Sequence, residues 1–167
     1  MNLRLENLAI IHATYEYLSW LRDKDVNLHS DNQYRVFTLE SQKNYIQSCI
    51  DDDNKQLLGI FDNEIHLGNI LINGLRSHHK KAEISYFVGK KEYWGLGVAS
   101  FAIAEAIKIA RNTHYLNKLY AGLAEPNIGS KKALEKNGFV HEGTRKMHLF
   151  YNGTFHDQLD YGLILND

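Results

Sequence analysis

This sequence of 167 residues has only one cysteine and one proline, and its formal net charge at pH 7 is only −1. The single cysteine, Cys49, cannot form an internal disulfide, so we expect a reducing compartment. Its neighbours Ile46 and Ile50 indicate a buried position and argue against a reactive thiol. Because 19 basic residues face 20 acidic ones, there is no basic field, and a nucleic-acid partner is not expected.

Long hydrophobic runs and linker segments are scarce as well. No apolar stretch approaches the ~20 residues of a membrane-spanning helix, and residues 1–6 lack the basic and then apolar order of a signal peptide. We therefore expect a cytoplasmic protein without a membrane partner. Because 44% of the residues are hydrophobic and no Pro, Gly or Ser-rich linker interrupts the chain, we expect residues 1–167 to form a single domain.

Hydrophobic periodicity predicts a mixed α/β chain. Two final strands are expected to flank Asn152-Gly153, which is a strong hairpin signal. The order β-α-α-β-β-β-α-β-α-β-β differs from the regular alternation of a doubly wound dinucleotide fold. The other strands are predicted at residues 2–7, 57–61, 65–73, 82–88 and 118–123, and the helices at residues 8–21, 39–50, 101–111 and 130–137.

Residues 93–100, Tyr-Trp-Gly-Leu-Gly-Val-Ala-Ser, lie between the predicted strand 82–88 and the predicted helix 101–111. A strand, a glycine turn and a helix start point several backbone N–H groups outward together, and this geometry holds phosphate oxygens. The third glycine of a dinucleotide fold and the Gly-Lys-Ser/Thr of a Walker loop are both missing, so neither of those sites is predicted. We expect a phosphorylated ligand at this phosphate-binding turn, defined as Trp94, Gly95, Leu96, Gly97, Val98, Ala99 and Ser100.

Two blocks of sequence match a known family. Residues 94–99 fit the pattern R/Q-x-x-G-x-G/A, with Gly97 and Ala99 at the small positions and Trp94 in place of Arg or Gln. Residues 125–145 contain segments that fit N-x-x-S, E-K-x-G-F and E-G-x-x-R. On these motifs nearly the whole chain resembles the GNAT superfamily of acyl-CoA-dependent N-acyltransferases, and within it the RimJ/RimL-like branch.

The resemblance implies a mostly antiparallel sheet flanked by helices, with two central strands that splay apart. It also implies N-acetyltransferase activity with acetyl-CoA as co-substrate. The pyrophosphate of acetyl-CoA would lie on the phosphate-binding turn, and its pantetheine arm would lie on Asn127 and on the backbone of Tyr86, Phe87 and Val88. An ordinary buried strand at residues 86–88 stays open as the alternative. No metal is predicted, because the nine histidines lack zinc spacing with carboxylate or thiol partners.

Acyl transfer from a thioester to an amine needs a base for the amine proton and stabilisation of the leaving thiolate, and it needs no covalent enzyme nucleophile. Strand alternation places Glu83, Ser85 and Phe87 on one face of the predicted strand. We predict that Glu83 is the catalytic base, acting directly or through water. A strand-end Glu83 in solvent, or one paired with Lys81, is the alternative.

The catalytic acid follows from the resemblance. Many GNAT enzymes carry a tyrosine acid at the position that Leu134 occupies in this chain. In the RimJ/RimL-like branch, the serine of N-x-x-S is assigned to contact the CoA sulfur, and this residue is Ser130. A helix N-cap is the competing and compatible role for Ser130.

The acceptor implied by the resemblance is a primary amine, of a small molecule or a peptide, that attacks acetyl-CoA directly in a ternary complex. Residues 17–23, Tyr-Leu-Ser-Trp-Leu-Arg-Asp, would line the acceptor cleft, and their mixture of aromatic and polar groups suits an amino sugar carried on a nucleotide. A protein N-terminal α-amine of the ribosomal-protein type stays open, as does a non-catalytic acyl-CoA-binding module. A homodimer also stays open.

Overall fold

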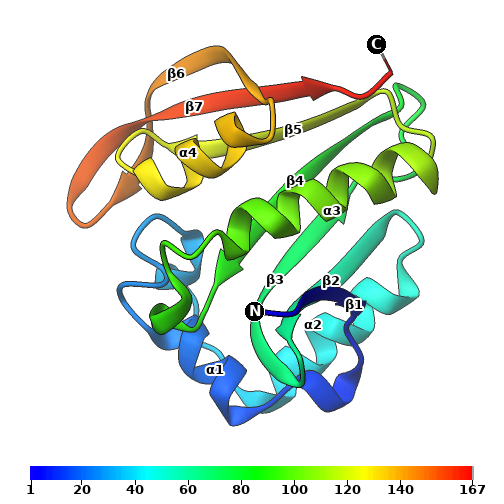
Figure 1. The fold of residues 1–167 in the computed structure, drawn as a ribbon. Helices are drawn as coiled ribbons and strands as arrows, with labels where there is room; N and C mark the ends of the chain where they lie inside the picture. Colours follow the sequence, from blue (N-terminus) through cyan, green and yellow to red (C-terminus); the bar gives the residue numbers. More distant parts are fainter. Residues whose placement is uncertain (167) are drawn as a thin grey trace.

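One seven-stranded sheet organises the protein, in the strand order β1-β2-β3-β4-β5-β7-β6 (Figure 1). The computed structural model describes residues 1–166. Neighbouring strands are antiparallel except β4 and β5, which are parallel. This confirms the predicted α/β fold with a mixed, mostly antiparallel sheet. The elements are β1 (Leu3–Asn7), η1 (Ile10–His12), α1 (Tyr15–Arg22), η2 (Asp31–Tyr34), α2 (Leu39–Asp51), β2 (Lys55–Asp62), β3 (Ile65–Asn73), β4 (Lys81–Val88), η3 (Lys91–Tyr93), α3 (Val98–Asn112), β5 (Lys118–Ala124), α4 (Ile128–Lys136), β6 (Val140–Tyr151) and β7 (Thr154–Ile164).

Turn residues with positive φ join the strands of both long hairpins. Asn63, with φ of 50°, lies between β2 and β3. Asn152 and Gly153, with φ of 55° and 76°, lie between β6 and β7. Two successive residues with positive φ form the tight turn whose twist suits antiparallel strands. The predicted final hairpin is confirmed, and the strands predicted at residues 57–61 and 65–73 pair as a hairpin as well.

The first helix begins later than predicted. Leu8 still belongs to the pairing of β1 with β2, because its backbone N–H donates to the carbonyl of Leu57 at 3.1 Å. A short 3-10 turn follows, and α1 begins at Tyr15, where the Thr14 hydroxyl accepts a hydrogen bond from the N–H of Tyr17 at 3.1 Å. The predicted start at residue 8 is therefore wrong, because periodicity alone does not reveal this cap.

The helices α3 and α4 begin earlier than predicted. α3 starts at Val98, directly after Gly97, and not at residue 101. α4 starts at Ile128, and the side-chain oxygen of Asn127 caps it by accepting a hydrogen bond from the N–H of Ser130 at 3.2 Å. The N-cap role for Ser130 is therefore wrong. Ser130 lies within the first helical turn, and its hydroxyl is available for another partner.

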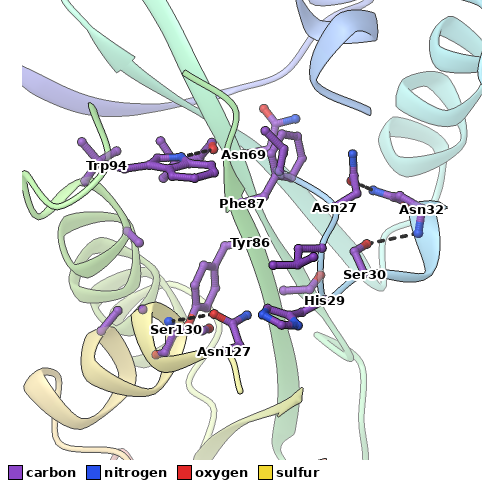
Figure 2. Close-up of a pocket in the computed structure, with 18 of the residues that line it drawn as sticks. Asn27, His29, Ser30, Asn32, Asn69, Tyr86, Phe87, Trp94, Asn127 and Ser130 are labelled. Carbon is purple, nitrogen blue, oxygen red and sulfur yellow. Dashed lines mark hydrogen bonds between the residues drawn. The ribbon is translucent and has the colours of Figure 1, made fainter. Parts of the chain in front are cut away.

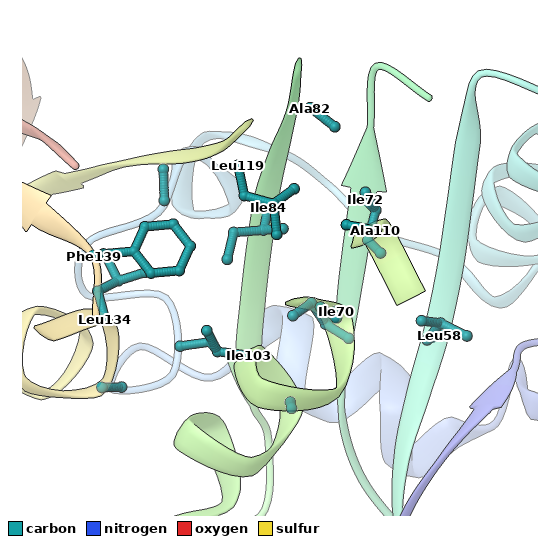
Figure 3. Close-up of a cluster of buried hydrophobic side chains, with 14 of the residues drawn as sticks. Leu58, Ile70, Ile72, Ala82, Ile84, Ile103, Ala110, Leu119, Leu134 and Phe139 are labelled. Atoms are coloured by element: carbon teal, nitrogen blue, oxygen red, sulfur yellow. The ribbon is translucent and has the colours of Figure 1, made fainter. Parts of the chain in front are cut away.

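Helices cover both faces of the sheet and close a hydrophobic cluster on each face. α3 and α4 cover one face, where Ile103 and Leu134 join the buried side chains of the central strands (Figure 3). α1 and α2 cover the other face, and Cys49 of α2 is 3% exposed in that second cluster. The predicted burial of Cys49 is therefore confirmed. Within residues 1–166, no helix is long and apolar enough to cross a membrane.

β4 and β5 separate soon after they meet. Their pairing joins Lys81–Glu83 of β4 to Lys118–Tyr120 of β5. Beyond this point β4 stays paired with β3 as far as Val88, and β5 stays paired with β7 as far as Ala124, so the gap between β4 and β5 widens (Figure 1). In the part of the chain that the structure describes, the facing edges of the two strands have no strand partner there. The predicted splay of the central strands is confirmed.

Leu134 tests how α4 is held on the sheet. Its side chain is 1% exposed and belongs to the same buried cluster as Phe139. We expect Leu134→Ala to lower the free energy of unfolding by about 2–5 kcal/mol, because the change removes buried contacts and leaves a cavity. Ile128→Ala in the same helix is the control, because Ile128 is 52% exposed. Urea unfolding measures both variants, and equal losses would contradict this packing of α4.

Candidate active site

The gap between β4 and β5 opens into a cavity of about 900 Å³ (Figure 2). Its walls come from the end of β4, the phosphate-binding turn, the start of α4, and the side of the molecule formed by α1 and α2. The volume is within the range of roughly 300–1,000 Å³ that is typical of small-molecule sites. The predicted site residues that line the cavity are Tyr86, Phe87, Val88, Trp94, Gly95, Gly97, Val98, Ala99, Ser100, Asn127 and Ser130.

The phosphate-binding turn presents an uncovered helix start to this cavity. Gly95 and Gly97 have φ of 75° and 85°, a backbone conformation that favours glycine, and Gly97 occupies the N-cap of α3 without a capping side chain. The first N–H groups of a helix have no partner within the helix, and they lie at the positive end of its dipole. Residues 98–100 therefore offer donors to an anionic ligand. Leu96 of the same turn is 54% exposed and lies outside the cavity wall.

Trp94 connects the turn to the end of β4. Its indole N–H donates to the carbonyl oxygen of Val88 at 2.8 Å (Figure 2), and the residue is 45% exposed. Trp94 therefore borders the cavity and provides a donor for the Val88 carbonyl. Tyr86 and Phe87 remain as cavity-lining residues of β4 beyond its pairing with β5.

The side chain of Tyr86 reaches from β4 across the cavity to α4. Its hydroxyl lies 2.6 Å from the hydroxyl oxygen of Ser130 (Figure 2). Burial raises the pKa of Tyr86 to about 12, although the hydrogen bond to Ser130 acts in the opposite direction. Tyr86 is therefore protonated at neutral pH, and the pair places two hydroxyl groups together at the α4 end of the cavity.

Sequence reasoning used Tyr86 for its backbone and missed its hydroxyl. Leu134, at the position of the expected family tyrosine, is 1% exposed in the core and carries no acid. Strand alternation places the Tyr86 side chain on the opposite face from Glu83, and this was the one feature of the sequence that could have indicated a separate role for its hydroxyl. The partner, Ser130, lies 44 residues away, and periodicity does not reveal this contact.

Glu83 lies at the point where β4 and β5 separate, because it is the last residue of β4 that pairs with β5. It is exposed, and it lies outside the cavity wall that holds the other predicted residues. Although much of its surface is exposed, the partial burial of Glu83 is the main cause that raises its pKa, the negative charge of Asp160 raises it further, and the charge of Arg145 opposes both. The Lys81 ammonium lies over the ring of Tyr120, 5.7 Å from its centroid, and among residues 1–166 it makes no ion pair with Glu83.

The connection between α1 and α2 forms the wall opposite α4. Asn27 is 4% exposed and holds this connection in place, because its side chain donates to the carbonyl of Trp20 at 2.7 Å and accepts from Asn32 at 3.2 Å (Figure 2). His29 lies in the same wall, and burial and the nearby charge of His156 lower its pKa. This wall therefore combines polar groups that are uncharged at neutral pH, from Asn27, His29, Ser30 and Asn32, with the charged Asp25 and Arg35.

The segment 17–23 contributes only part of its length to this wall. Tyr17 and Leu21 line the cavity, whereas Trp20 is 6% exposed in the second hydrophobic cluster. Two further polar residues, Gln42 of α2 and Asn69 of β3, line the cavity and were missed from the sequence. Each is a single polar residue within an amphipathic helix or an apolar strand. Such a residue indicates a binding site only weakly when the fold is not known.

The cavity thus has donors for phosphate at one end and paired hydroxyl groups at another, with an unpaired strand edge between them. These features suit an extended ligand that carries phosphates. Across residues 1–166, no three His, Cys, Asp or Glu side chains gather as a metal site would require.

Comparison with known proteins identifies the family to which this fold belongs. Residues 2–140 match the acetyltransferase (GNAT) domain family. Over 97 residues the chain is 33% identical to the Bacillus subtilis protein named "Putative ribosomal N-acetyltransferase YdaF". That match covers 58% of this chain and 52% of the other protein, so the chain spans about half the length of this curated relative.

Solved structures share the fold along nearly the whole chain. The ribosomal alpha-N-protein acetyltransferase RimL, in complex with coenzyme A, has a TM-score of 0.88 at 22% identity, covering 99% of this chain and 96% of that one. The spermidine N-acetyltransferase of Vibrio cholerae, in complex with CoA and spermine, has a TM-score of 0.87 at 18% identity, covering 98% and 96%. At these identities the likeness establishes the fold alone. With the family match, the resemblance found in the sequence is confirmed: the chain belongs to the GNAT acetyltransferase domain family.

Proposed function

We propose that the protein is an acetyl-CoA-dependent N-acetyltransferase that acetylates a primary amine by direct attack in a ternary complex. The observation that carries this proposal is the path along the cavity, from the N–H groups at the start of α3, past the unpaired edge of β4, to the hydroxyls of Tyr86 and Ser130. Helix-start N–H groups bind phosphate, and an open strand edge binds an extended arm through backbone hydrogen bonds. Acetyl-CoA has both features.

The proposed acetyl-CoA site uses three parts of the chain. The phosphate-binding turn holds the pyrophosphate. The backbone of Tyr86 and Phe87 bonds the pantetheine arm, while the Val88 carbonyl keeps its Trp94 donor. Asn127 uses its side-chain oxygen to cap α4, so its amide nitrogen is the group left for a pantetheine carbonyl.

The reaction joins the amine nitrogen to the thioester carbonyl carbon and breaks the carbon–sulfur bond. The sulfur leaves with the electron pair of that bond and takes up a proton to become the free thiol. Ser130 supplies this proton from its hydroxyl, Tyr86 replaces it through the 2.6 Å contact, and Tyr86 then regains a proton from solvent. Because its pKa is raised to about 12, Tyr86 begins the reaction with its proton in place.

The attacking amine also loses a proton, and Glu83 is the proposed base. Glu83 lies where β4 and β5 separate, and it lies outside the cavity wall. We therefore propose that it acts through water. Burial and the neighbouring Asp160 raise the pKa of Glu83. A carboxylate with a raised pKa accepts a proton more readily than an ordinary one.

An amino sugar carried on a nucleotide is the first acceptor we propose. The acceptor side of the cavity combines aromatic rings with uncharged polar groups, and such groups pack on sugar or base rings and bond hydroxyl groups. Arg35 lines the same cavity and offers a guanidinium group that suits phosphate.

A protein N-terminal α-amine is the second candidate, favoured by the similarity to the relative named as a ribosomal N-acetyltransferase. A non-catalytic acyl-CoA-binding module is the third. Thiol release from acetyl-CoA separates them when it is measured with a UDP-linked amino sugar, with a tripeptide that has a free N-terminus, and with spermidine. Release with the sugar or with the peptide identifies the acceptor class, and binding of acetyl-CoA without any release supports the module.

The first prediction concerns binding of acetyl-CoA. At 100 times its dissociation constant, the ligand adds about 2.7 kcal/mol to the stability of the folded protein, and the Tm rises. Gly97→Glu is expected to abolish the rise, because it strains a residue with φ of 85° and places a carboxylate at the phosphates. Gly153→Glu is the matched control, because Gly153 has φ of 76° in the last hairpin and also has open space around it. Equal Tm shifts in both variants would contradict the proposed site.

The second prediction concerns pH. Only the carboxylate form of Glu83 accepts a proton, so kcat/KM is expected to rise with pH through the raised pKa of Glu83 and then to level off. In Glu83→Gln we expect kcat to fall by about tenfold or more and this acidic limb to disappear. Glu64→Gln is the control, because the Glu64 side chain is 95% exposed in a hairpin turn. A loss of less than a few-fold at every pH would remove Glu83 as the base.

The third prediction treats Tyr86 and Ser130 as one unit. Tyr86→Phe and Ser130→Ala should each lower kcat with little change in KM for acetyl-CoA, and the double variant should be no slower than the worse single variant. Tyr161→Phe is the control, because it also removes a phenol that donates to a side chain, Glu135, at 3.0 Å, and it lies outside the cavity wall. Independent, multiplying losses in kcat would show that the two hydroxyls do not share a proton path.

A further inference from the structure

Three residues that line the cavity each have a buried side-chain nitrogen atom that makes no hydrogen bond: Nδ1 of His29, Nε2 of Gln42 and Nδ2 of Asn69. Gln42 is 2% exposed and Asn69 is 3% exposed. A buried donor without an acceptor is unfavourable, so such groups in native proteins call for a specific explanation. Their common position on one cavity indicates a ligand that brings its own acceptor atoms.

The orientation of the Asn69 amide is set by His66. His66 Nε2 lies 2.8 Å from Oδ1 of Asn69 and 3.1 Å from the carbonyl oxygen of Gly68. The Gly68 carbonyl can only accept, so Nε2 of His66 carries the hydrogen. The Asn69 atom that faces the ring must then also be an acceptor, which is Oδ1. Burial lowers the pKa of His66 and keeps the ring neutral. The remaining amide nitrogen of Asn69 is therefore left as a donor at the cavity wall.

Gln42 lies on the helix that faces this strand. Both amides lie near the hydroxyl of Tyr17, whose pKa is raised mainly by burial and is lowered in part by the two amides. The two amides act on Tyr17 as weak hydrogen-bond donors would, but neither nitrogen reaches the distance and angle of a hydrogen bond with any acceptor. The apolar neighbours Leu57 and Phe87 line the same part of the cavity and offer no acceptor of their own. Figure 2 shows Asn69 beside Phe87 at this end of the site.

The charges around the cavity do not suit a polycation. Asp25 is the one acidic residue among those that line it within residues 1–166, and its carboxylate bonds the Lys91 ammonium at 2.5 Å. Arg35, Lys132 and Lys136 line the cavity as well and add positive charge. A polyamine carries a further ammonium group near the reacting amine, and a desolvated ammonium requires a carboxylate partner.

We infer that Gln42 and Asn69 form an acceptor subsite that binds a carbonyl or hydroxyl oxygen of the acceptor, and that this subsite disfavours polyamines. The inference rests on the proposed function and deepens it. A peptide carbonyl and a sugar hydroxyl share this chemistry, and the two sources are separated by the probes below.

Two pairs of variants test the subsite. Gln42→Met and Asn69→Leu keep the approximate size of each side chain and remove the unpaired donors. Without any ligand we expect Gln42→Met to raise the Tm, because a buried donor without a partner is lost. Asn69→Leu also removes the oxygen that accepts from His66 Nε2 at 2.8 Å, so only its acceptor KM serves as a test. With the tripeptide Ala-Ala-Ala and with a UDP-linked amino sugar, we expect KM to rise at least about tenfold for whichever probe the wild type acetylates, with KM for acetyl-CoA unchanged.

Gln42→Glu and Asn69→Asp replace an amide that donates hydrogen bonds with a carboxylate that only accepts them. We expect KM for the same probe to rise and KM for spermidine to fall. Asn44→Asp on α2 is the matched control, because Asn44 is exposed and lies outside the cavity wall, and it should change none of these values.

Three results would overturn the inference. They are a lower Tm in Gln42→Met, an unchanged acceptor KM in Gln42→Met and Asn69→Leu, and a wild-type preference for spermidine. Failure of the proposed function looks different, because it would leave the wild-type protein without a Tm shift in acetyl-CoA or without thiol release from any probe. In that case the change in Tm of Gln42→Met still decides whether the Gln42 donor lacks a partner.

Discussion

The separation of β4 from β5 is the constraint on which the rest of the site depends. Parallel pairing ends at Glu83, and both strands then continue, each held by its other neighbour. The exposed strand edges gain no hydrogen bonds from one another, so the arrangement persists because packing on both faces of the sheet holds it. The start of α3, the start of α4 and the side chain of Tyr86 all meet in the resulting gap.

Features that depend on neighbouring residues could be predicted from the sequence. The Asn152-Gly153 turn needs positive φ at two successive residues, and this local requirement fixes the last hairpin. The glycines of the phosphate-binding turn act in the same way, since Gly97 adopts a backbone conformation that few other residues tolerate. The family resemblance added the splay of the central strands, which local patterns do not contain.

Features that depend on distant residues could not be predicted in this way. Helix starts were misplaced at Leu8 and Ser130, because the caps supplied by Thr14 and Asn127 compete with equally suitable polar neighbours. The Tyr86 hydroxyl meets Ser130 only once β4 and α4 are in place. The polar residues of the acceptor wall come from separate elements as well. Glu83 keeps its predicted place on the strand, but the fold puts it outside the cavity wall.

Amide hydrogen exchange of β4, with and without saturating CoA, tests the central claim most directly. If the open edge of this strand binds the pantetheine arm, exchange in the segment 84–89 and at the start of α3 slows by about tenfold or more, while the distant hairpin around Gly153 is unchanged. Protection confined to other parts of the chain, or none at all, would contradict the account of the gap between β4 and β5 as the acetyl-CoA site.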